Sequence, residues 1–223
     1  MAQDLRSFLD AVKRAKPDDV QVVKKEVDPA YEITALVVKL ERELKRRPVL
    51  VFENVKGTKF PVITNLHASR GRLAAAIGAP PDEMLKKYLH AMEEPIAPRV
   101  VPTGPVKEVI IRGDQVDLGA LPQILHHEGD AGAYLTAAIS FAKDPTKDGW
   151  NCAYNRLMIK GRDTTSIHLT VGKHLWEYQR LAEARGEALP VAFAIGVHPA
   201  IALGALAIGS IDEDERAIMG SLF

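Results

Sequence analysis

The chain has 223 residues and no net formal charge, because 29 Lys and Arg residues balance 29 Asp and Glu residues. This balance argues against nucleic-acid binding through bulk charge, since neutralising phosphates requires a basic surplus. Hydrophobic residues make up 47% and charged residues 26%, which excludes a disordered or collagen-like chain. The single cysteine, Cys152, excludes an internal disulfide and a cysteine-based zinc site, so we expect an intracellular protein.

No segment resembles a membrane span or a signal peptide. The longest weakly polar stretch, residues 191–211, is interrupted by Gly196, Pro199 and Gly204, which predicts a strand and a small-residue helix. The N-terminus carries Asp4 and Arg6 within an amphipathic pattern. We therefore expect a cytoplasmic protein with no membrane partner.

The first ninety residues alternate between helical and extended patterns. Apolar residues from Leu5 to Val12 recur at helical spacing, and Pro17 predicts the end of that helix. Further helices are expected at 33–44, 69–77 and 82–92, the last with Asp82 as its N-cap. Valine-rich runs predict strands at 20–27, 48–52 and 60–64, the last two joined by a hairpin turn at 54–57. These elements indicate a compact α/β unit.

Prolines at positions 95, 98, 102 and 105 predict a linker, and the pattern beyond them is mostly extended. Strands are expected at 106–111, 134–143, 150–159, 164–170 and 191–195, with a turn at 160–163 and one helix at 175–185. Strands in such quick succession are typical of a small barrel or sandwich. We expect an α+β protein with domains at 1–105 and 106–223.

Four of the seven histidines, His126, His127, His168 and His174, fall in the β-rich half. For each alone the simplest interpretation is a surface or satisfied core residue. His174 stands just before a helix, and Gly172 and Lys173 precede it. A glycine allows close backbone approach and a lysine attracts anions, so this position is a candidate anion or metal site.

Asn151 and Arg156 are five positions apart, so on one regular strand their side chains would face opposite sides unless a bend intervenes. The loop at 121–136 is long and carries placed polar residues, which is compatible with either a functional or a structural loop. The acidic run at 212–216 is most simply a solvated helix start without a catalytic role. Phosphate-loop, dinucleotide-turn, zincin and α/β-hydrolase motifs are absent from the sequence.

Several short segments together resemble the UbiD family of decarboxylases, which use prenylated FMN. They occur in the family's order over essentially the whole chain, at 116–122, 129–136, 144–145, 151–156, 173–174 and 194–200. The resemblance implies an N-terminal α/β domain followed by a split β-barrel of the flavin-reductase type, here expected to be partial.

The resemblance also implies a set of site residues. Asn151 and His174 would be ligands of a divalent metal, usually Mn²⁺, that holds the cofactor phosphate. Lys173 would contact the flavin, residues Tyr154, Asn155 and Arg156 would line it, and Arg156 would be catalytic beside the substrate carboxylate. A nearby K⁺ would be held by backbone carbonyls, some of them in the stretch 202–207.

The implied reaction is reversible, non-oxidative decarboxylation of an aromatic or α,β-unsaturated carboxylic acid. The prenylated flavin would add to the acid, CO₂ would leave, and a carboxyl group would return a proton. A flavin prenyltransferase would supply the cofactor. Relatives run to roughly twice this length, more than one core usually spans. We therefore expect the glutamate that completes the metal site, and the paired catalytic glutamates, to lie beyond Phe223, with neither Glu213 nor Glu215 as a substitute.

Three interpretations follow from the missing glutamates. The chain is the N-terminal part of a longer decarboxylase, or a short subunit of a homo-oligomer or hetero-complex whose partner supplies them, or a non-catalytic cofactor- and phosphate-binding or assembly module. A metal-dependent hydrolase built on His126, His127, His168 and His174 ranks far lower.

Overall fold

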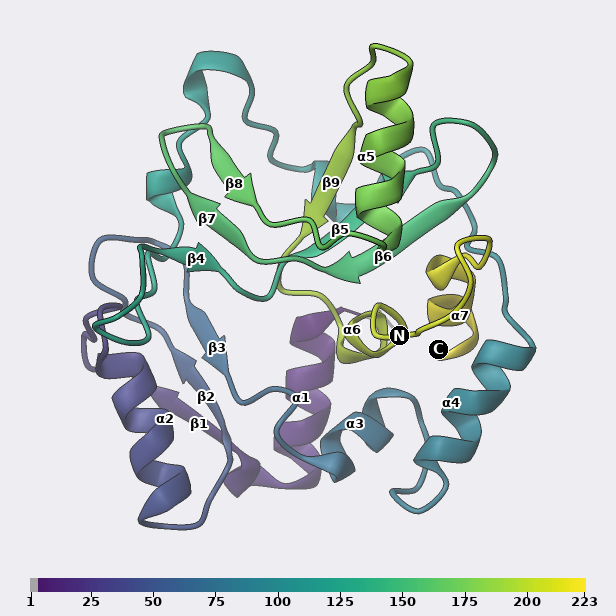
Figure 1. Cartoon of the computed structure of the whole chain (residues 1–223). Helices are drawn as coiled ribbons and strands as arrows, with labels where there is room; N and C mark the ends of the chain where they lie inside the picture. The colour runs from purple at the N-terminus through teal and green to yellow at the C-terminus, as the bar shows by residue number, and fades with distance from the viewer. Residues whose placement is uncertain (1–3) are drawn as a thin grey trace.

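The computed structural model describes residues 4–223, whose strands form three separate three-stranded sheets flanked by helices (Figure 1). This arrangement confirms the mixed α+β class. The first half contains α1 (Leu5–Ala15), β1 (Val20–Val23), α2 (Glu32–Arg42), β2 (Val49–Phe52), β3 (Val62–Thr64), α3 (Arg70–Ala76) and α4 (Met84–Glu93). The second half contains β4 (Tyr134–Leu135), β5 (Ile139–Lys143), β6 (Trp150–Tyr154), β7 (Leu157–Ile159), β8 (Thr165–Ile167), α5 (His174–Ala184), β9 (Val191–Ala194), α6 (Pro199–Gly204) and α7 (Glu215–Ser221).

The first sheet is buried on both faces. Its central strand β2 runs parallel to β1 and antiparallel to β3, which confirms the expected hairpin. Because successive side chains of a strand point to opposite faces, Leu50 and Phe52 pack in a cluster with Ile33 of α2. Val49 packs on the other face with Phe8 of α1. The apolar run of β2 therefore joins two helices through one strand.

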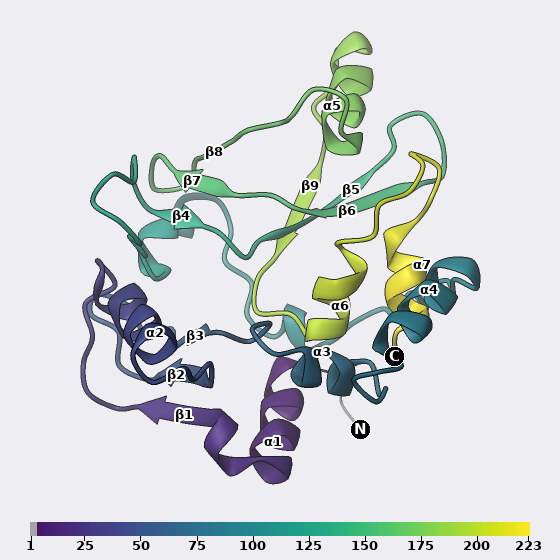
Figure 2. The ribbon, with the colours of Figure 1, turned by 60° about the horizontal axis from the view of Figure 1, so that its bottom comes forward.

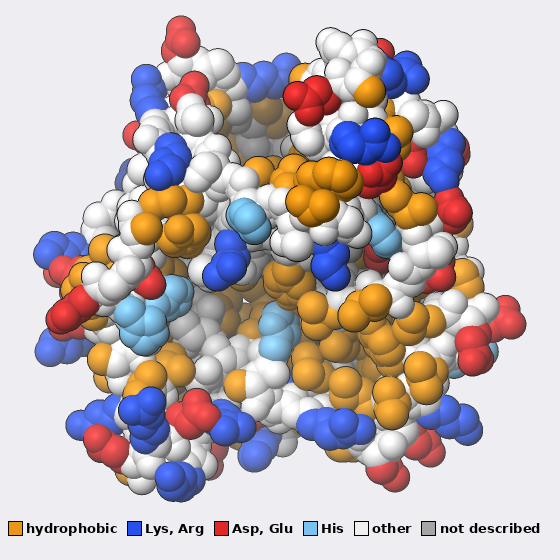
Figure 3. Space-filling model, viewed as in Figure 1, with side chains coloured by type: hydrophobic (Ala, Val, Ile, Leu, Met, Phe, Trp, Pro, Cys, Tyr) orange, Lys and Arg blue, Asp and Glu red, His pale blue; other side chains and the backbone are white. Residues whose placement is uncertain are grey.

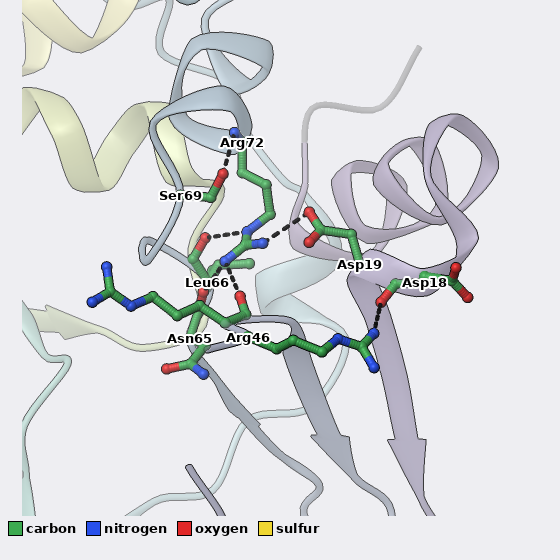
Figure 4. Close-up of polar contacts among 8 residues, drawn as sticks. Asp18, Asp19, Arg46, Asn65, Leu66, Ser69 and Arg72 are labelled. Carbon is green, nitrogen blue, oxygen red and sulfur yellow. Dashed lines mark hydrogen bonds and ion pairs between the residues drawn. The ribbon is translucent and has the colours of Figure 1, made fainter. Parts of the chain in front are cut away.

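Arg72 ties this sheet to α3 through a buried guanidinium (Figure 4). The residue is 4% exposed, and its Nη1 donates to Asp19 Oδ2 at 2.8 Å. Its other N–H groups donate to the main-chain carbonyls of Arg47, Asn65 and Leu66. A buried guanidinium is tolerated only when its donors are paired, so this network fixes the chain after β3 against the neighbouring segments.

The segment between α4 and β4 departs from the prediction. The sequence predicts a strand at 106–111, and this is wrong: a 3-10 turn at Pro105–Lys107 begins an irregular stretch. Val106 and Val109 are 87% and 77% exposed, so the apolar pattern does not mark a strand buried within residues 4–223. The expected Asp82 cap is also wrong, because α4 begins after Glu83, whose side chain makes no capping bond.

The second half forms two antiparallel sheets, in the orders β6-β5-β9 and β4-β7-β8. The strands expected at 134–143 and 150–159 are each divided between these two sheets. At the corner, Asn155 N donates to Ala138 O and Asn155 Nδ2 donates to Ser140 Oγ. The bend therefore lies between Asn151, which is on β6, and Arg156, which directly precedes β7. The turn at 160–163 is as expected, closed by Lys160 N donating to Thr164 O.

Helices α3, α4, α6 and α7 pack together beside the sheets (Figure 2). Ile77 and Ala91 from the first half share a buried cluster with Leu203 and Ile218 from the second half. The packing is close, because a Cβ on Gly220 of α7 would collide with the carbonyl oxygen of Ile96. No helix within residues 4–223 is long and apolar enough to cross a bilayer.

Candidate functional site

Asn151 lies buried on β6, the edge strand of its sheet, at 4% exposure. Its Nδ2 donates to Glu215 Oε1 at 3.0 Å. Its Oδ1 is buried and has no hydrogen-bond partner within residues 4–223. A buried acceptor without a donor is costly, so this oxygen is suited to an electropositive ligand.

Glu215 is the first residue of α7 and is 4% exposed. Its Oε2 accepts a hydrogen bond from the backbone N–H of Cys152 at 3.0 Å, which covers the open edge of β6. Burial raises the pKa of the Glu215 carboxyl, and the hydrogen bonds from Cys152 and Asn151 oppose that rise. These hydrogen bonds hold the Glu215 side chain in place, although burial disfavours its charged form.

The position of Glu215 corrects one sequence-based expectation. The run at 212–216 is not simply a solvated helix start, because Glu215 faces inward while Glu213 is exposed. A carboxylate of this chain does reach Asn151. The sequence held a signal for this, since Glu215 is followed at helical spacing by Ile218, Met219 and Leu222, which are all buried.

His174 begins α5, with its Nδ1 3.8 Å from Glu215 Oε1 and 3.4 Å from Asn151 Nδ2. Gly172 adopts a φ of +80° in the turn before the helix, a conformation that favours glycine. Apart from its chain neighbours, no atom of residues 4–223 lies within 4 Å of a Cβ built on Gly172, so this turn, and not a tight contact, explains the glycine. Lys173 occupies the N-cap position, with an exposed side chain that makes no capping bond.

Three side chains from three elements thus converge: Asn151 of β6, His174 of α5 and Glu215 of α7. Together they offer an amide oxygen, an imidazole nitrogen and a carboxylate, a donor set that suits a divalent cation such as Mn²⁺. Within residues 4–223 no group of three His, Cys, Asp or Glu side chains is placed to hold a metal. The amide oxygen of Asn151 is thus needed to complete a three-ligand set.

The neighbouring predicted residues lie around the corner between β6 and β7. Tyr154 packs against the core cluster of Ile139 and Cys152, and burial raises the pKa of its phenol. Asn155 is held by Ser140, as described above. Arg156 is exposed, and its side chain makes no hydrogen bond or ion pair with the rest of residues 4–223. Its guanidinium is therefore available to a ligand.

The remaining histidines are placed separately. His126 Nδ1 lies 2.9 Å from Thr34 Oγ1, and the backbone N–H groups of His126 and His127 donate to Asp130 Oδ2. His168 is exposed after β8. These contacts do not favour the four-histidine hydrolase site. Figure 3 shows histidine and basic side chains around a hollow near the middle of this face, between the sheets of the second half and the helices below them.

Comparison with known proteins shows two family matches. Residues 13–92 match the N-terminal domain of 3-octaprenyl-4-hydroxybenzoate carboxy-lyase, and residues 99–223 match its Rift-related domain, UbiD. An anhydromevalonate phosphate decarboxylase from Methanothermobacter thermautotrophicus is 31% identical over 96% of this chain and 47% of its own length. The chain spans about half the length of the curated relatives it matches.

Solved structures agree with these matches. The UbiD-class enzyme HmfF from Pelotomaculum thermopropionicum, in a dimeric form with prenylated FMN, is 41% identical with a TM-score of 0.91. It covers 100% of this chain, which covers 51% of HmfF. Vanillic acid decarboxylase from Sedimentibacter hydroxybenzoicus, in its closed form, is 28% identical with a TM-score of 0.90, over 100% of this chain and 48% of its own. The chain belongs to the UbiD family.

Proposed function

We propose that this chain forms the cofactor-binding half of a UbiD-class decarboxylase. Its reaction is the reversible, non-oxidative decarboxylation of an aromatic or α,β-unsaturated carboxylic acid. The observation that carries the proposal is the convergence of Asn151, His174 and Glu215, together with the buried Asn151 Oδ1, which has no partner among residues 4–223. Relatives named as decarboxylases, among them a phenolic acid decarboxylase from Streptomyces, support the substrate class.

Asn151 Oδ1, the His174 imidazole and the Glu215 carboxylate would hold Mn²⁺, which in turn would bind the phosphate of the cofactor. The fit rests on the orphaned Oδ1 and on hard or borderline donors suited to this ion. A K⁺ nearby would be held by backbone carbonyls in the stretch 202–207. Within this stretch the carbonyls of Leu203 and Gly204 already accept from Leu206 N and Ala207 N, so the other carbonyls would be the ligands.

Prenylated FMN would lie along Tyr154, Asn155, Arg156, Lys173 and His174. When bound, this cofactor supplies the electron-accepting ring that allows CO₂ to leave. The chain's own residues bind and orient. Lys173 presents an exposed ammonium beside His174, where it would attract the phosphate.

Arg156 is the catalytic residue in this proposal. Its guanidinium is exposed and unpaired within residues 4–223, at the corner where β6 ends and β7 begins. A guanidinium can hold a carboxylate through two parallel hydrogen bonds, so Arg156 would orient the carboxylate that is lost as CO₂.

The proton donors would come from polypeptide outside this chain. Within residues 4–223 the buried carboxylates are Asp144 and Glu215, and Asp144 accepts hydrogen bonds from the backbone and side chain of Thr146. We therefore propose that activity requires further polypeptide, in a homo-oligomer or with a partner subunit. A flavin prenyltransferase would supply the cofactor.

The domain assignment is part of the same proposal. Residues 1–105 would be the N-terminal α/β domain, and residues 106–223 a partial split β-barrel of the flavin-reductase type. Two short antiparallel sheets joined at strand corners support the barrel assignment.

A second candidate is a non-catalytic cofactor-binding or assembly subunit. The exposed apolar side chains of the segment after α4 favour it, since Val100 and Val106 are 91% and 87% exposed. Exposed apolar groups in sequence are typical of a surface that another polypeptide covers. This candidate predicts cofactor binding without turnover, even with the added polypeptide.

The test is cofactor retention after co-expression with a flavin prenyltransferase, Mn²⁺ and K⁺. Flavin bound to the purified chain is measured by anaerobic absorption and by mass analysis of the denatured supernatant. We expect retention by the wild type and by His168→Ala, an exposed histidine in the same half, and loss in His174→Ala. Equal retention by both variants would contradict the assignment of His174.

A further inference from the structure

Two consecutive residues of β6 contact two consecutive residues of α7. Asn151 donates to Glu215, and beside that contact the Trp150 ring lies under the Arg216 guanidinium, with Cζ 4.2 Å from the ring centroid. Trp150 and Asn151 point to opposite sides of the strand, since side chains alternate along it. The Asn151–Glu215 contact is therefore part of the candidate site, and the Trp150–Arg216 contact lies on the other side of β6.

Helix α7 has seven residues, Glu215–Ser221, too few for a helix to be stable by itself. Its first turn must be held by tertiary contacts. Asp214 caps it by accepting from Arg216 N at 3.0 Å, and the same carboxylate accepts from Arg216 Nε and Nη2. Asp214 thus fixes the orientation of the guanidinium that lies on Trp150.

We propose that Trp150 and Arg216 are positioning residues for the Glu215 carboxylate. Their cation–π contact holds the first turn of α7 on the edge of β6, so that Glu215 faces Asn151 and His174. Arg216 is 26% exposed and Asp214 29%, so the contact is partly shielded from solvent, and shielding strengthens a cation–π pair. This inference rests on the proposed metal-binding function but concerns residues that would not touch the metal.

The test compares variants that remove the contact with variants that preserve it. Trp150→Leu removes the aromatic face and Trp150→Phe keeps one, while Arg216→Gln removes the cation and Arg216→Lys keeps one. Arg185→Gln, at an exposed arginine paired with Glu187, controls for the loss of a positive charge. Mn²⁺ affinity is measured by electron paramagnetic resonance on the full chain.

A second readout needs no metal. The Cys152 amide donates to Glu215 Oε2, so its hydrogen-exchange rate reports directly whether the carboxylate is in place. The amides of β5, which pair within the sheet, report the stability of the strands themselves. Both are read by nuclear magnetic resonance in metal-free protein.

We expect Trp150→Leu and Arg216→Gln to weaken Mn²⁺ binding about tenfold, the effect typical of residues that orient metal ligands. The Cys152 amide should exchange faster in both variants, and the amides of β5 should exchange as in the wild type. Trp150→Phe, Arg216→Lys and Arg185→Gln should behave as wild type in both measurements. Unchanged exchange at Cys152, or equal acceleration throughout β5, would overturn the inference. If the wild type binds no Mn²⁺, the metal proposal fails, and exchange at Cys152 still decides the positioning role.

Discussion

Glu215 Oε1 accepts a hydrogen bond from Asn151 Nδ2 at 3.0 Å, although 64 positions separate the two residues in the chain. The contact joins the first turn of a short helix to the edge of a sheet. It leaves the Asn151 Oδ1 atom buried without a partner among the residues described. The side-chain amide that contacts the buried Glu215 carboxylate therefore also carries a buried acceptor without a donor.

Replacing Arg72 should destabilise the fold. Arg72→Met leaves the Asp19 carboxylate and three main-chain carbonyls without their donor. The free energy of unfolding should fall by about 2–4 kcal/mol, as for a broken buried ion pair. Arg70→Met, on the same helix at an exposed position, should cost less than about 1 kcal/mol. Urea denaturation measures the free energy of unfolding of both variants. Equal losses would show that the buried Arg72 network stabilises the fold no more than the exposed Arg70 does.

Gly220→Ala should displace α7. A Cβ at this position would collide with the Ile96 carbonyl oxygen, and backbone atoms cannot move aside as a flexible side chain can. Although alanine favours helix, the overlap should dominate and lower the free energy of unfolding by about 1–3 kcal/mol.

The matched control for Gly220→Ala is Gly104→Ala, where no atom of the described residues beyond its chain neighbours lies within 4 Å of the added Cβ. This variant should unfold at the wild-type temperature. Because α7 carries Glu215, Gly220→Ala should also weaken Mn²⁺ binding, and Gly104→Ala should not. A stable Gly220→Ala chain with normal Mn²⁺ binding would refute the close packing of α7 on Ile96.

His198 should make the stability depend on pH. Its Nδ1 accepts from Ala200 N–H at the start of α6, and burial lowers the pKa of the imidazole, opposed by the charge of Asp4. The unfolded chain, with an ordinary His pKa of about 6.5, therefore binds the proton more readily than the folded chain. Stability contributed by neutral His198 is present above about pH 6.5 and is lost as the pH falls below it.

The test is thermal unfolding of the wild type and His198→Asn between pH 5 and about pH 7.5, the window around an ordinary histidine pKa. Asparagine keeps an acceptor for the helix start but does not titrate. The wild type should lose more stability than the variant on acidification. Parallel profiles would exclude His198 as a source of the pH dependence.

Arg156→Ala should separate binding from turnover. The side chain is exposed and makes no contact that stabilises the described fold, so the unfolding temperature should stay at the wild-type value. In an assembled decarboxylase that includes the partner polypeptide, flavin retention should persist while product formation stops. Product formation at the wild-type rate would remove Arg156 from its catalytic role.

Elements with strong local patterns were predictable from the sequence. The helix from Leu5 ends before Pro17, and the β2–β3 hairpin follows its turn residues, because periodicity and turn chemistry act over a few residues. The expected strand at 106–111 failed, since apolar alternation says nothing about whether a neighbouring strand is present. The division of the 134–143 and 150–159 runs between two sheets depends on long-range pairing at Asn155.

The site was partly predictable for a related reason. Asn151 and His174 were named as metal ligands from the family resemblance, and the structure brings them close together. For Glu215 the sequence predicts a solvated position, because acids near a helix start usually face solvent. The inward position of Glu215 follows from its helical spacing to the buried Ile218 and Leu222. The functional roles of all three residues stay predictions.

The most direct measurement is an Mn²⁺ titration of the full chain, followed by electron paramagnetic resonance. It compares the wild type with Glu215→Gln and with Glu213→Gln, the exposed acid two residues away. We predict one saturable site in the wild type and in Glu213→Gln, and at least about tenfold weaker binding in Glu215→Gln, because a neutral amide replaces the anionic ligand. Wild-type affinity in Glu215→Gln would contradict the metal site that underlies the proposed function.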